Sequence, residues 1–412
     1  MSFDIRPATA QEMGQLGLMG AYSYGGAFGD GPDNKVATGT RPEWTLCAFD
    51  AGRMQADGQA TMATSFSAFP FTTRVNGRGV AMAGISTVGT RPEYRRRGLV
   101  RQIITRAFAQ QRERGQSVAG LWASQAAIYQ RYGFAPAGGL RAYNVDTVDI
   151  NLLHQGEEPA VQRFDGVEAL DAVRQLYKEF IAQRTGYLHR GKSLWLDNVL
   201  APPTEDGPVY VAVVGSLAAP TGYLVYTLRA HRVAHKSRGQ EIRIRDFAWL
   251  DKTAYVALWR YLARHDLVGR VVWNSAPIDD PAPDIFVEPR MLHTQDLEGT
   301  WWRLVDVPAA LAQRGYDVEG SLVLRITEDD LAPWNVGSWR VEYGPEGAVV
   351  VTTDAAADVT VSVRALSSLY SGHSSARHLA NAQLIDVTDE TALTRFDQML
   401  RTRFAPHCPD HY

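Results

Sequence analysis

The sequence predicts an α/β chain of three successive regions, and three observations support this. Short stretches of alternating apolar and polar residues, typical of strands, interleave with amphipathic stretches typical of helices. The order strand, strand, strand, helix, strand in the first region returns in the second. The length of 412 residues allows two to four domains at about 100–200 residues each. We therefore expect domains over residues 1–150, 151–300 and 301–412.

The first region opens with a strand and a capped helix. Residues 3–7 alternate, and Thr9 precedes Glu12 by three positions, the spacing of a capping box. Residues 20–33 carry several glycines and predict a loop. Asn76-Gly77 predicts a hairpin turn and Gly115 a helix C-cap. The other elements expected are strands at 44–48, 59–71, 80–88, 118–123 and 141–148, and helices at 102–114 and 127–132.

The second region repeats this order, and a smaller α+β region follows it from about Trp301. A helix is expected over 165–184, and Asp251-Lys252-Thr253 predicts the cap of a helix that ends at His265. Strands are expected at 208–214, 221–229, 240–250 and 269–274. In the last region we expect strands at 302–307, 321–326, 339–343, 348–353 and 359–363, and helices at 308–314 and 389–404.

Composition and charge favour a soluble globular protein. The chain has 42 Lys and Arg against 45 Asp and Glu, a net charge of −3, which gives no general attraction to nucleic acid. Residues 1–10 contain Asp4 and no apolar core of a signal peptide. The most apolar stretch, residues 209–219, is interrupted by Gly215 and Ser216, so we expect no membrane span and a cytoplasmic location.

The few cysteines and histidines predict neither a disulfide framework nor a metal site. Cys47 and Cys408 are the two cysteines and lie far apart in the sequence. His231 and His235 are four residues apart, but their surroundings resemble a basic hairpin loop. We therefore expect no metal cofactor.

Residues 95–100, Arg-Arg-Arg-Gly-Leu-Val, carry the clearest chemical signal. They follow an expected strand and open an expected helix, where backbone N–H groups lack partners and carry partial positive charge. A glycine there lets an anion approach the backbone, and arginines add charged contacts to phosphate. The segment predicts a pyrophosphate site. The alternative is a solvated basic segment before a helix.

This segment resembles the acyl-CoA loop of the GNAT acetyltransferases, whose pattern is [Q/R]-x-x-G-x-[G/A], with Val100 in place of the last small residue. Residues 128–134, Ile-Tyr-Gln-Arg-Tyr-Gly-Phe, resemble a second GNAT motif, in which the first tyrosine protonates the departing thiolate. That position is Tyr129; the alternative is a core aromatic. The resemblance also implies that the strand at 85–88 splays from its neighbour and that an N–H near Val88 polarises the thioester carbonyl.

The resemblance further assigns cofactor contacts, with acetyl-CoA as co-substrate. Gln125 stands where relatives commonly carry an acidic residue. The contacts implied are Val88, Gly89, Thr90, Arg96, Arg97, Gly98, Leu99, Val100, Arg101, Ser124 and Gln125.

The whole chain resembles the Eis family, with tandem GNAT domains and a C-terminal domain similar to sterol carrier proteins. The second region lacks glycine and an arginine pair at residues 249–255, so we expect a non-catalytic copy. In that family the chain end enters the first domain and its α-carboxylate takes the amine proton, a role that falls on Tyr412. The alternative for Tyr412 is a frayed end. The resemblance also implies a homo-oligomer, a hexamer.

The resemblance implies an N-acetyltransferase that acts on primary amines of aminoglycosides, polyamines or lysine side chains through direct attack in a ternary complex. Substrate pockets in the family are wide, aromatic and acidic. The alternative function is a hydrophobic-ligand-binding protein that uses the sterol-carrier-like domain and has an idle CoA site. Candidate substrate contacts are Phe28, Asp30, Asp33, Glu43 and Trp195.

Overall fold

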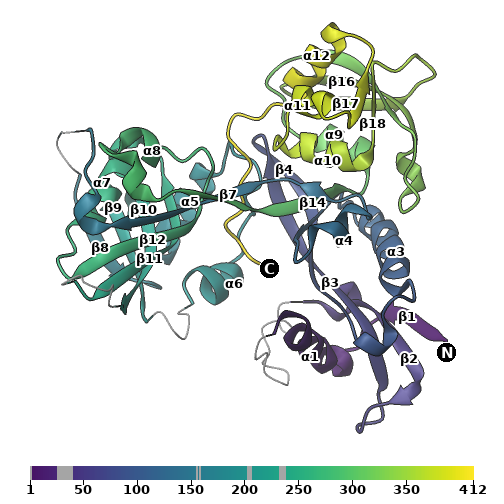
Figure 1. The fold of residues 1–412 in the computed structure, drawn as a ribbon, viewed down its shortest axis with the longest axis horizontal. Helices are drawn as coiled ribbons and strands as arrows, with labels where there is room; N and C mark the ends of the chain where they lie inside the picture. The colour runs from purple at the N-terminus through teal and green to yellow at the C-terminus, as the bar shows by residue number, and fades with distance from the viewer. Residues whose placement is uncertain (1, 26–39, 155, 157–158, 202–206, 232–237) are drawn as a thin grey trace.

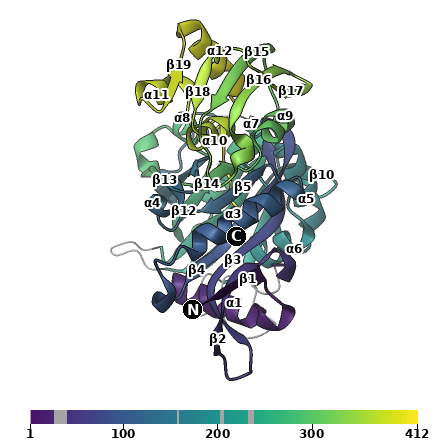
Figure 2. The same cartoon turned by 90° about the vertical axis from the view of Figure 1, so that its right-hand side faces the viewer.

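A computed structural model describes residues 2–25, 40–154, 156, 159–201, 207–231 and 238–412. Three sheets form three domains that meet around a central junction, with the C-terminal segment running between the first and second (Figures 1 and 2). This confirms the predicted mixed α/β architecture. No helix in the described part of the chain is long and apolar enough to cross a membrane.

The first domain is a seven-stranded sheet between two helices. Helix α1 (Met13–Tyr24) packs on one face and α3 (Leu99–Glu113) on the other. The strand order is β1 (Phe3–Pro7), β2 (Leu46–Met54), β3 (Ala60–Val75), β4 (Arg78–Thr90), β5 (Val118–Trp122), β14 (Thr300–Leu304) and β6 (Ala135–Pro136).

Local sequence signals explain several boundaries in this domain. The amide of Thr9 donates to the Glu12 carboxylate at 2.8 Å, as the capping box requires. Asn76 and Gly77 have φ of 46° and 89° and connect β3 to β4. The prediction of a loop from residue 20 was wrong up to residue 24, because α1 continues through Tyr24. Buried packing of Met19 and Gly20 on the sheet outweighs the low helix propensity of glycine.

The second sheet lies between helices α5 (Leu170–Phe180) and α7 (Lys252–Ala263), which contribute to separate cores on its two faces. Short helices α6 (Lys192–Leu194) and α8 (Ala282–Ile285) flank it. The strand order is β13 (Gln295–Glu298), β7 (Gly139–Asp146), β12 (Val268–Ala276), β11 (Gln240–Trp249), β10 (Ala219–Ala230), β9 (Val209–Ser216) and β8 (Val161–Asp165).

The first two sheets exchange strands, which corrects two sequence assignments. Strand β7 was expected to close the first region but pairs with β12 in the second sheet. Strand β14, expected in the third region, pairs with β5 in the first sheet. Alternation in sequence predicts a strand but does not say which edge it joins, since any open edge offers the same hydrogen bonds.

The third domain has a five-stranded sheet, and its core continues into the first domain. Val75, Val80 and Met82 of β3 and β4 share one apolar cluster with Leu322 and Leu366 of the third domain. The sheet order is β17 (Gly347–Thr352), β16 (Gly337–Gly344), β15 (Gly320–Ile326), β18 (Val359–Val361) and β19 (Ile385–Val387). The helices are α9 (Val307–Gln313), α10 (Val363–Ser371), α11 (Ala376–Asn381) and α12 (Glu390–Leu400).

The last helix ends at Leu400, four residues earlier than the sequence predicted. Residues 401–412 form neither helix nor strand and run from the third domain to the junction of the first two (Figure 1). Much of this segment is buried: His407, Cys408 and Asp410 are each at most 3% exposed. The tail is therefore a packed part of the molecule.

Arg303 on β14 connects the first and third domains, and its substitution tests how much this contact stabilises the protein. Its guanidinium is 1% exposed and contacts Asp329 at 2.5 Å and the carbonyl oxygen of Tyr132 at 3.0 Å. Arg303→Met leaves a buried carboxylate without its cation, so we expect a loss of about 3–5 kcal/mol in a urea unfolding experiment. The exposed pair of Arg377 and Glu390 supplies the control, and Arg377→Met should cost less than about 1 kcal/mol. Equal losses in both variants would contradict this account.

Candidate active site

The site begins where two parallel strands of the first sheet separate. Pairing between β4 and β5 ends at Gly84 and Gly120. Beyond that point β4 carries a bulge, because Thr87 and Val88 lie opposite the single residue Phe66. Thr87 has a φ of 51°, and its carbonyl accepts a hydrogen bond from the Ser65 hydroxyl at 2.7 Å. The backbone of β4 at Thr87 and Val88 thus leaves the regular ladder, and the Tyr24 hydroxyl forms a hydrogen bond with the Val88 backbone.

The loop from β4 to α3 forms a concave backbone surface. Arg96 and Gly98 both have left-handed φ values, 63° and 72°, on either side of Arg97. Alternation of this kind turns successive N–H groups toward one side and creates an anion-binding concavity. The first helical hydrogen bond runs from the Gln102 amide to the Gly98 carbonyl, so the amides of the first turn of α3 have no partner within the helix. A Cβ on Gly98 would enter open space.

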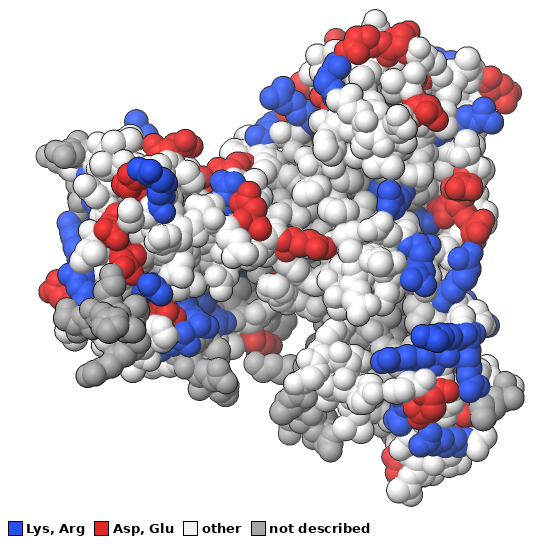
Figure 3. All heavy atoms as spheres, in the orientation of Figure 1, with Lys and Arg blue, Asp and Glu red and all other residues white. Residues whose placement is uncertain are grey.

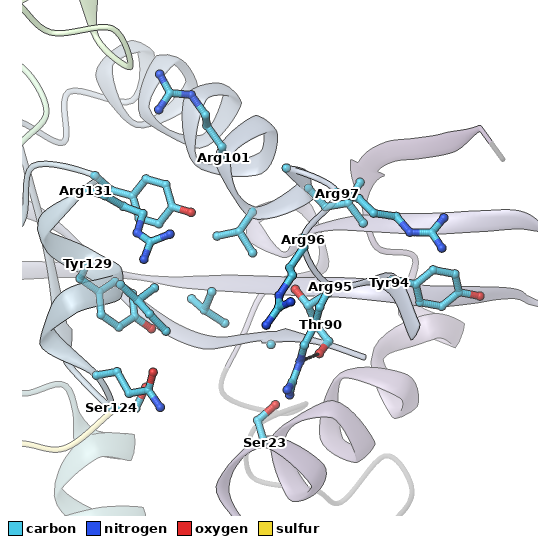
Figure 4. A pocket seen from close by; sticks show the side chains of 18 of the residues that line it. Ser23, Thr90, Tyr94, Arg95, Arg96, Arg97, Arg101, Ser124, Tyr129 and Arg131 are labelled. Atoms are coloured by element: carbon cyan, nitrogen blue, oxygen red, sulfur yellow. Dashed lines mark hydrogen bonds between the residues drawn. The ribbon is translucent and has the colours of Figure 1, made fainter. Parts of the chain in front are cut away.

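A cavity of about 660 Å³ lies against this loop (Figure 4). The structure brings to it all eleven residues predicted to contact the cofactor, together with Tyr129. Arginine side chains gather on this side of the first domain, near α3 and β1 (Figure 3). Further lining residues that sequence reasoning did not single out for contact are Ser23, Tyr24, Tyr94, Arg95, Ile128, Arg131 and Tyr132.

The arginines of the loop are not equivalent. Arg96 extends into the region between the loop and Tyr129, whereas Arg95 extends toward Ser23, and its Nε donates to the Thr90 carbonyl at 3.2 Å (Figure 4). Arg97 points away and donates to the Glu93 carbonyl at 3.1 Å. Arg101 reaches Asp330 of the third domain at 3.1 Å. Arg97 and Arg101 can therefore serve the cavity through backbone N–H groups, whereas Arg95 and Arg96 can offer guanidinium groups.

Tyr129 is positioned by the short helix α4 (Ala126–Gln130) and lies beside Ser124 (Figure 4). Its side chain is buried, and burial raises the pKa of its hydroxyl to about 12, while a hydrogen bond with Ser124 acts in the opposite direction. Its ring packs edge-on against Phe134 with centroids 6.0 Å apart. The phenol is therefore protonated at neutral pH and can act as a proton donor at the cavity wall.

Tyr412 reaches the same sheet from the other end of the chain. Its ring lies over the last paired residues of β4 and β5: a Cβ on Gly120 would be 3.0 Å from Tyr412 Oη, and one on Gly84 would be 3.1 Å from the ring. The ring also packs against Phe71, with centroids 4.9 Å apart. Gly84 makes room for Phe71 and Tyr412 together, and Gly120 makes room for Tyr412, where the two strands begin to separate.

Of the proposed substrate contacts that the structure describes, neither Trp195 nor Glu43 lines this cavity. Trp195 is 1% exposed and packs against Tyr177 and Tyr223. It lines a separate cavity of about 480 Å³, so a substrate contact there would have to use that cavity. Glu43 belongs to a short turn of 3-10 helix, whereas Phe28, Asp30 and Asp33 lie outside the described residues, as does His235.

The second domain has no equivalent anion site at its corresponding helix. Asp251 caps α7, and its carboxylate accepts a hydrogen bond from the Ala254 amide at 2.8 Å. A carboxylate therefore already occupies the helix N-terminus that a phosphate would need. No group of three or more potential metal ligands occurs among the residues that the structure describes.

Comparisons with known proteins agree with this geometry. Models of the GNAT acetyltransferase domain match residues 4–137 and 186–326, and a sterol carrier protein domain model matches residues 307–409. The fold and its cavity thus define a GNAT-type acetyltransferase with two GNAT domains and a sterol-carrier-like domain.

Individual relatives narrow the assignment. The chain is 31% identical over 330 residues to the N-acetyltransferase Eis of Mycobacterium tuberculosis, covering 76% of this chain and 77% of the relative. It is 29% identical over 425 residues to an uncharacterized N-acetyltransferase of Streptomyces griseus, with 100% of both chains covered. The crystal structure of Eis1 from Mycobacterium abscessus matches with a TM-score of 0.83 at 25% identity, over 100% of both chains. The chain belongs to the Eis family of GNAT N-acetyltransferases.

The hydroxyl of Tyr412 supplies a test of how the tail packs. Tyr412 Oη is buried and has no hydrogen-bond partner in the described structure, so removing it should relieve a desolvation cost of about 1–3 kcal/mol. We expect Tyr412→Phe to unfold at the same temperature or higher. The matched variant Tyr370→Phe loses a buried hydrogen bond to the Ala310 carbonyl (3.0 Å), so its unfolding temperature should be lower than that of the native protein. A lower unfolding temperature for Tyr412→Phe would contradict this packing.

Proposed function

We propose that this N-acetyltransferase uses acetyl-CoA and transfers its acetyl group to a primary amine by direct attack in a ternary complex. The observation that carries the proposal is the cavity that joins the N-terminus of α3, Val88 of the β4 bulge, and Tyr129. A pyrophosphate would be held by amides of Gly98, Leu99 and Val100 with Arg96 nearby. The thioester oxygen would accept a hydrogen bond from the Val88 amide.

Tyr129 is proposed as the general acid. When the amine nitrogen bonds to the carbonyl carbon and the carbon–sulfur bond breaks, the sulfur leaves as a thiolate. Tyr129 donates its proton to that sulfur and later regains one from solvent. Burial that raises the pKa of Tyr129 to about 12 would also raise that of a thiol in the same place, which keeps the proton transfer feasible.

The α-carboxylate of Tyr412 is proposed as the base. An α-carboxyl has a pKa of about 3.5 in water, so it becomes an effective base only where burial raises that value. The packing of the Tyr412 ring over Gly84 and Gly120 supports this role, because it brings the last residue of the sequence to the separation of β4 and β5. The carboxylate would also attract the cationic form of an amine.

The acceptors we propose are primary amines of aminoglycosides, polyamines or lysine side chains. Support comes from membership of the Eis family and from the carboxylate proposed at the site. An assay of thiol release from acetyl-CoA against these three classes distinguishes them. Absence of saturable acetyl-CoA binding at millimolar cofactor, measured by calorimetry, would favour the alternative, a binder of hydrophobic ligands, and thiol release with an amine would exclude an idle CoA site.

Tyr129→Phe tests the general acid. Removing the hydroxyl should lower kcat at least tenfold, about 1.4 kcal/mol, because the thiolate then leaves without a proton. Affinity for acetyl-CoA, measured by calorimetry, should change less than threefold. Tyr210→Phe on β9 removes a phenol far from the cavity and should leave kcat unchanged. Full kcat in Tyr129→Phe would exclude this role.

Deletion of Tyr412 tests the base, with Tyr412→Phe as the matched control. The deletion should lower kcat at least tenfold while the unfolding temperature of the protein changes by only a few degrees. Tyr412→Phe keeps the terminal carboxylate and should retain kcat within about threefold. Equal kcat values in the deletion and the native protein would rule out the terminal carboxylate as the base.

A further inference from the structure

A buried ion cluster connects the tail to the second domain. Arg190 contacts Asp246 on β11 (Nη1 to Oδ2, 2.5 Å) and Asp410 in the tail (Nε to Oδ1, 2.9 Å). The side chains of the three residues are 1%, 5% and 2% exposed. Charges this deeply buried interact much more strongly than surface ion pairs, and removing one partner exposes the other to a large desolvation cost.

The second domain fixes the position of the guanidinium independently of the tail. Arg190 lies over the rings of Tyr177 (4.0 Å to the centroid) and Trp195 (4.7 Å). Tyr223 donates to Asp246 Oδ2 at 2.7 Å, which orients the first carboxylate. Arg190 therefore presents its Nε to the tail while its other contacts lie within the second domain, and the buried Trp195 ring forms part of that support.

On its other side Asp410 contacts the first domain. Its carbonyl oxygen accepts a hydrogen bond from Trp122 Nε1 at 3.0 Å, and the adjacent His411 stacks on the Trp122 ring with centroids 3.9 Å apart. Trp122 ends β5, the strand whose separation from β4 receives Tyr412. Asp410 thus stands two residues before the chain end, between the second domain and the separated strands.

We propose that Arg190 is a positioning residue that anchors the tail through Asp410 and so sets where Tyr412 enters the first domain. The role rests on the proposed part of Tyr412 in catalysis. It gives the second GNAT domain, which has no equivalent anion site at α7, a task in the reaction: it holds the segment that completes the first domain. Without this anchor a terminal segment with no helix or strand would fray.

Charge balance within the cluster predicts which substitutions of Asp410 are tolerated. One guanidinium faces two buried carboxylates, and burial raises the pKa of Asp410 to about 6. A neutral acceptor at residue 410 is therefore compatible with the cluster. Asp410→Asn keeps an oxygen for the guanidinium to bond, whereas Asp410→Ala leaves Arg190 Nε without an acceptor and keeps the pair of Arg190 and Asp246 intact.

The test uses the full-length chain and measures tail docking separately from activity. Carboxypeptidase releases Tyr412 only from an undocked end, so its rate reports the undocked population. Asp410→Ala should accelerate release at least tenfold and lower kcat, with KM for acetyl-CoA within twofold. Asp410→Asn should restore both values to within about threefold of the native protein. Arg403 lies earlier in the tail and makes an exposed contact with Asp317. Arg403→Met breaks this contact and should change neither the rate of Tyr412 release nor kcat.

The outcomes separate the anchor from the proposed function. Unchanged release in Asp410→Ala overturns the anchor, whatever the activity. Failure of Asp410→Asn to restore slow release also overturns it, because the guanidinium would still have its acceptor. Faster release with unchanged kcat supports the anchor alone, because a tenfold rise in a rare undocked form removes little of the docked population, and deletion of Tyr412 then decides its proposed role. Faster release with lower kcat, restored by Asp410→Asn, supports both.

Discussion

The separation of β4 from β5 beyond Gly84 and Gly120 is the constraint on which the rest of the site depends. A continuous ladder would use the backbone groups of β4 and leave no space between the strands. The bulge at Thr87 and Val88 lies beyond this point and takes Val88 out of the ladder, and the Tyr412 ring packs over the last paired glycines, Gly84 and Gly120. The cavity proposed for the cofactor and the packing site of Tyr412 therefore both lie where β4 and β5 separate.

Maintaining such a gap requires support from outside the first sheet. Strand β14 pairs with β5 on the edge that faces away from β4, and its Arg303 ties the turn at Tyr132 to Asp329 of the third domain. The tail packs on the sheet beside the gap, with the Tyr412 ring against Phe71 and over Gly84 and Gly120. The second and third domains thus both contribute contacts beside this opening, through Arg303 with Asp329 and through Arg190 with Asp410.

The sequence predicted most elements and the whole loop wall of the cavity, because those features depend on local patterns. Gly98 follows three arginines at the start of an amphipathic helix. The glycine permits the left-handed backbone conformation and the arginines supply positive charge, and an anion-binding loop needs both. The strand exchange of β7 and β14 was not predictable, since pairing partners are set by distant packing. Ser23 and Tyr24 were missed because α1 extends into residues whose glycines suggest a loop. Arg190 was not predicted to contact the tail, because no recognisable motif surrounds it in the sequence.

Amide hydrogen exchange with and without acetyl-CoA tests the central claim most directly, because it reports on the backbone groups themselves. We expect slower exchange at Val88 and across residues 98–101 when acetyl-CoA is bound, with no change at residues 249–255, where Asp251 already caps α7. Protection at 249–255 with none at 98–101, or no protection at either, would contradict it.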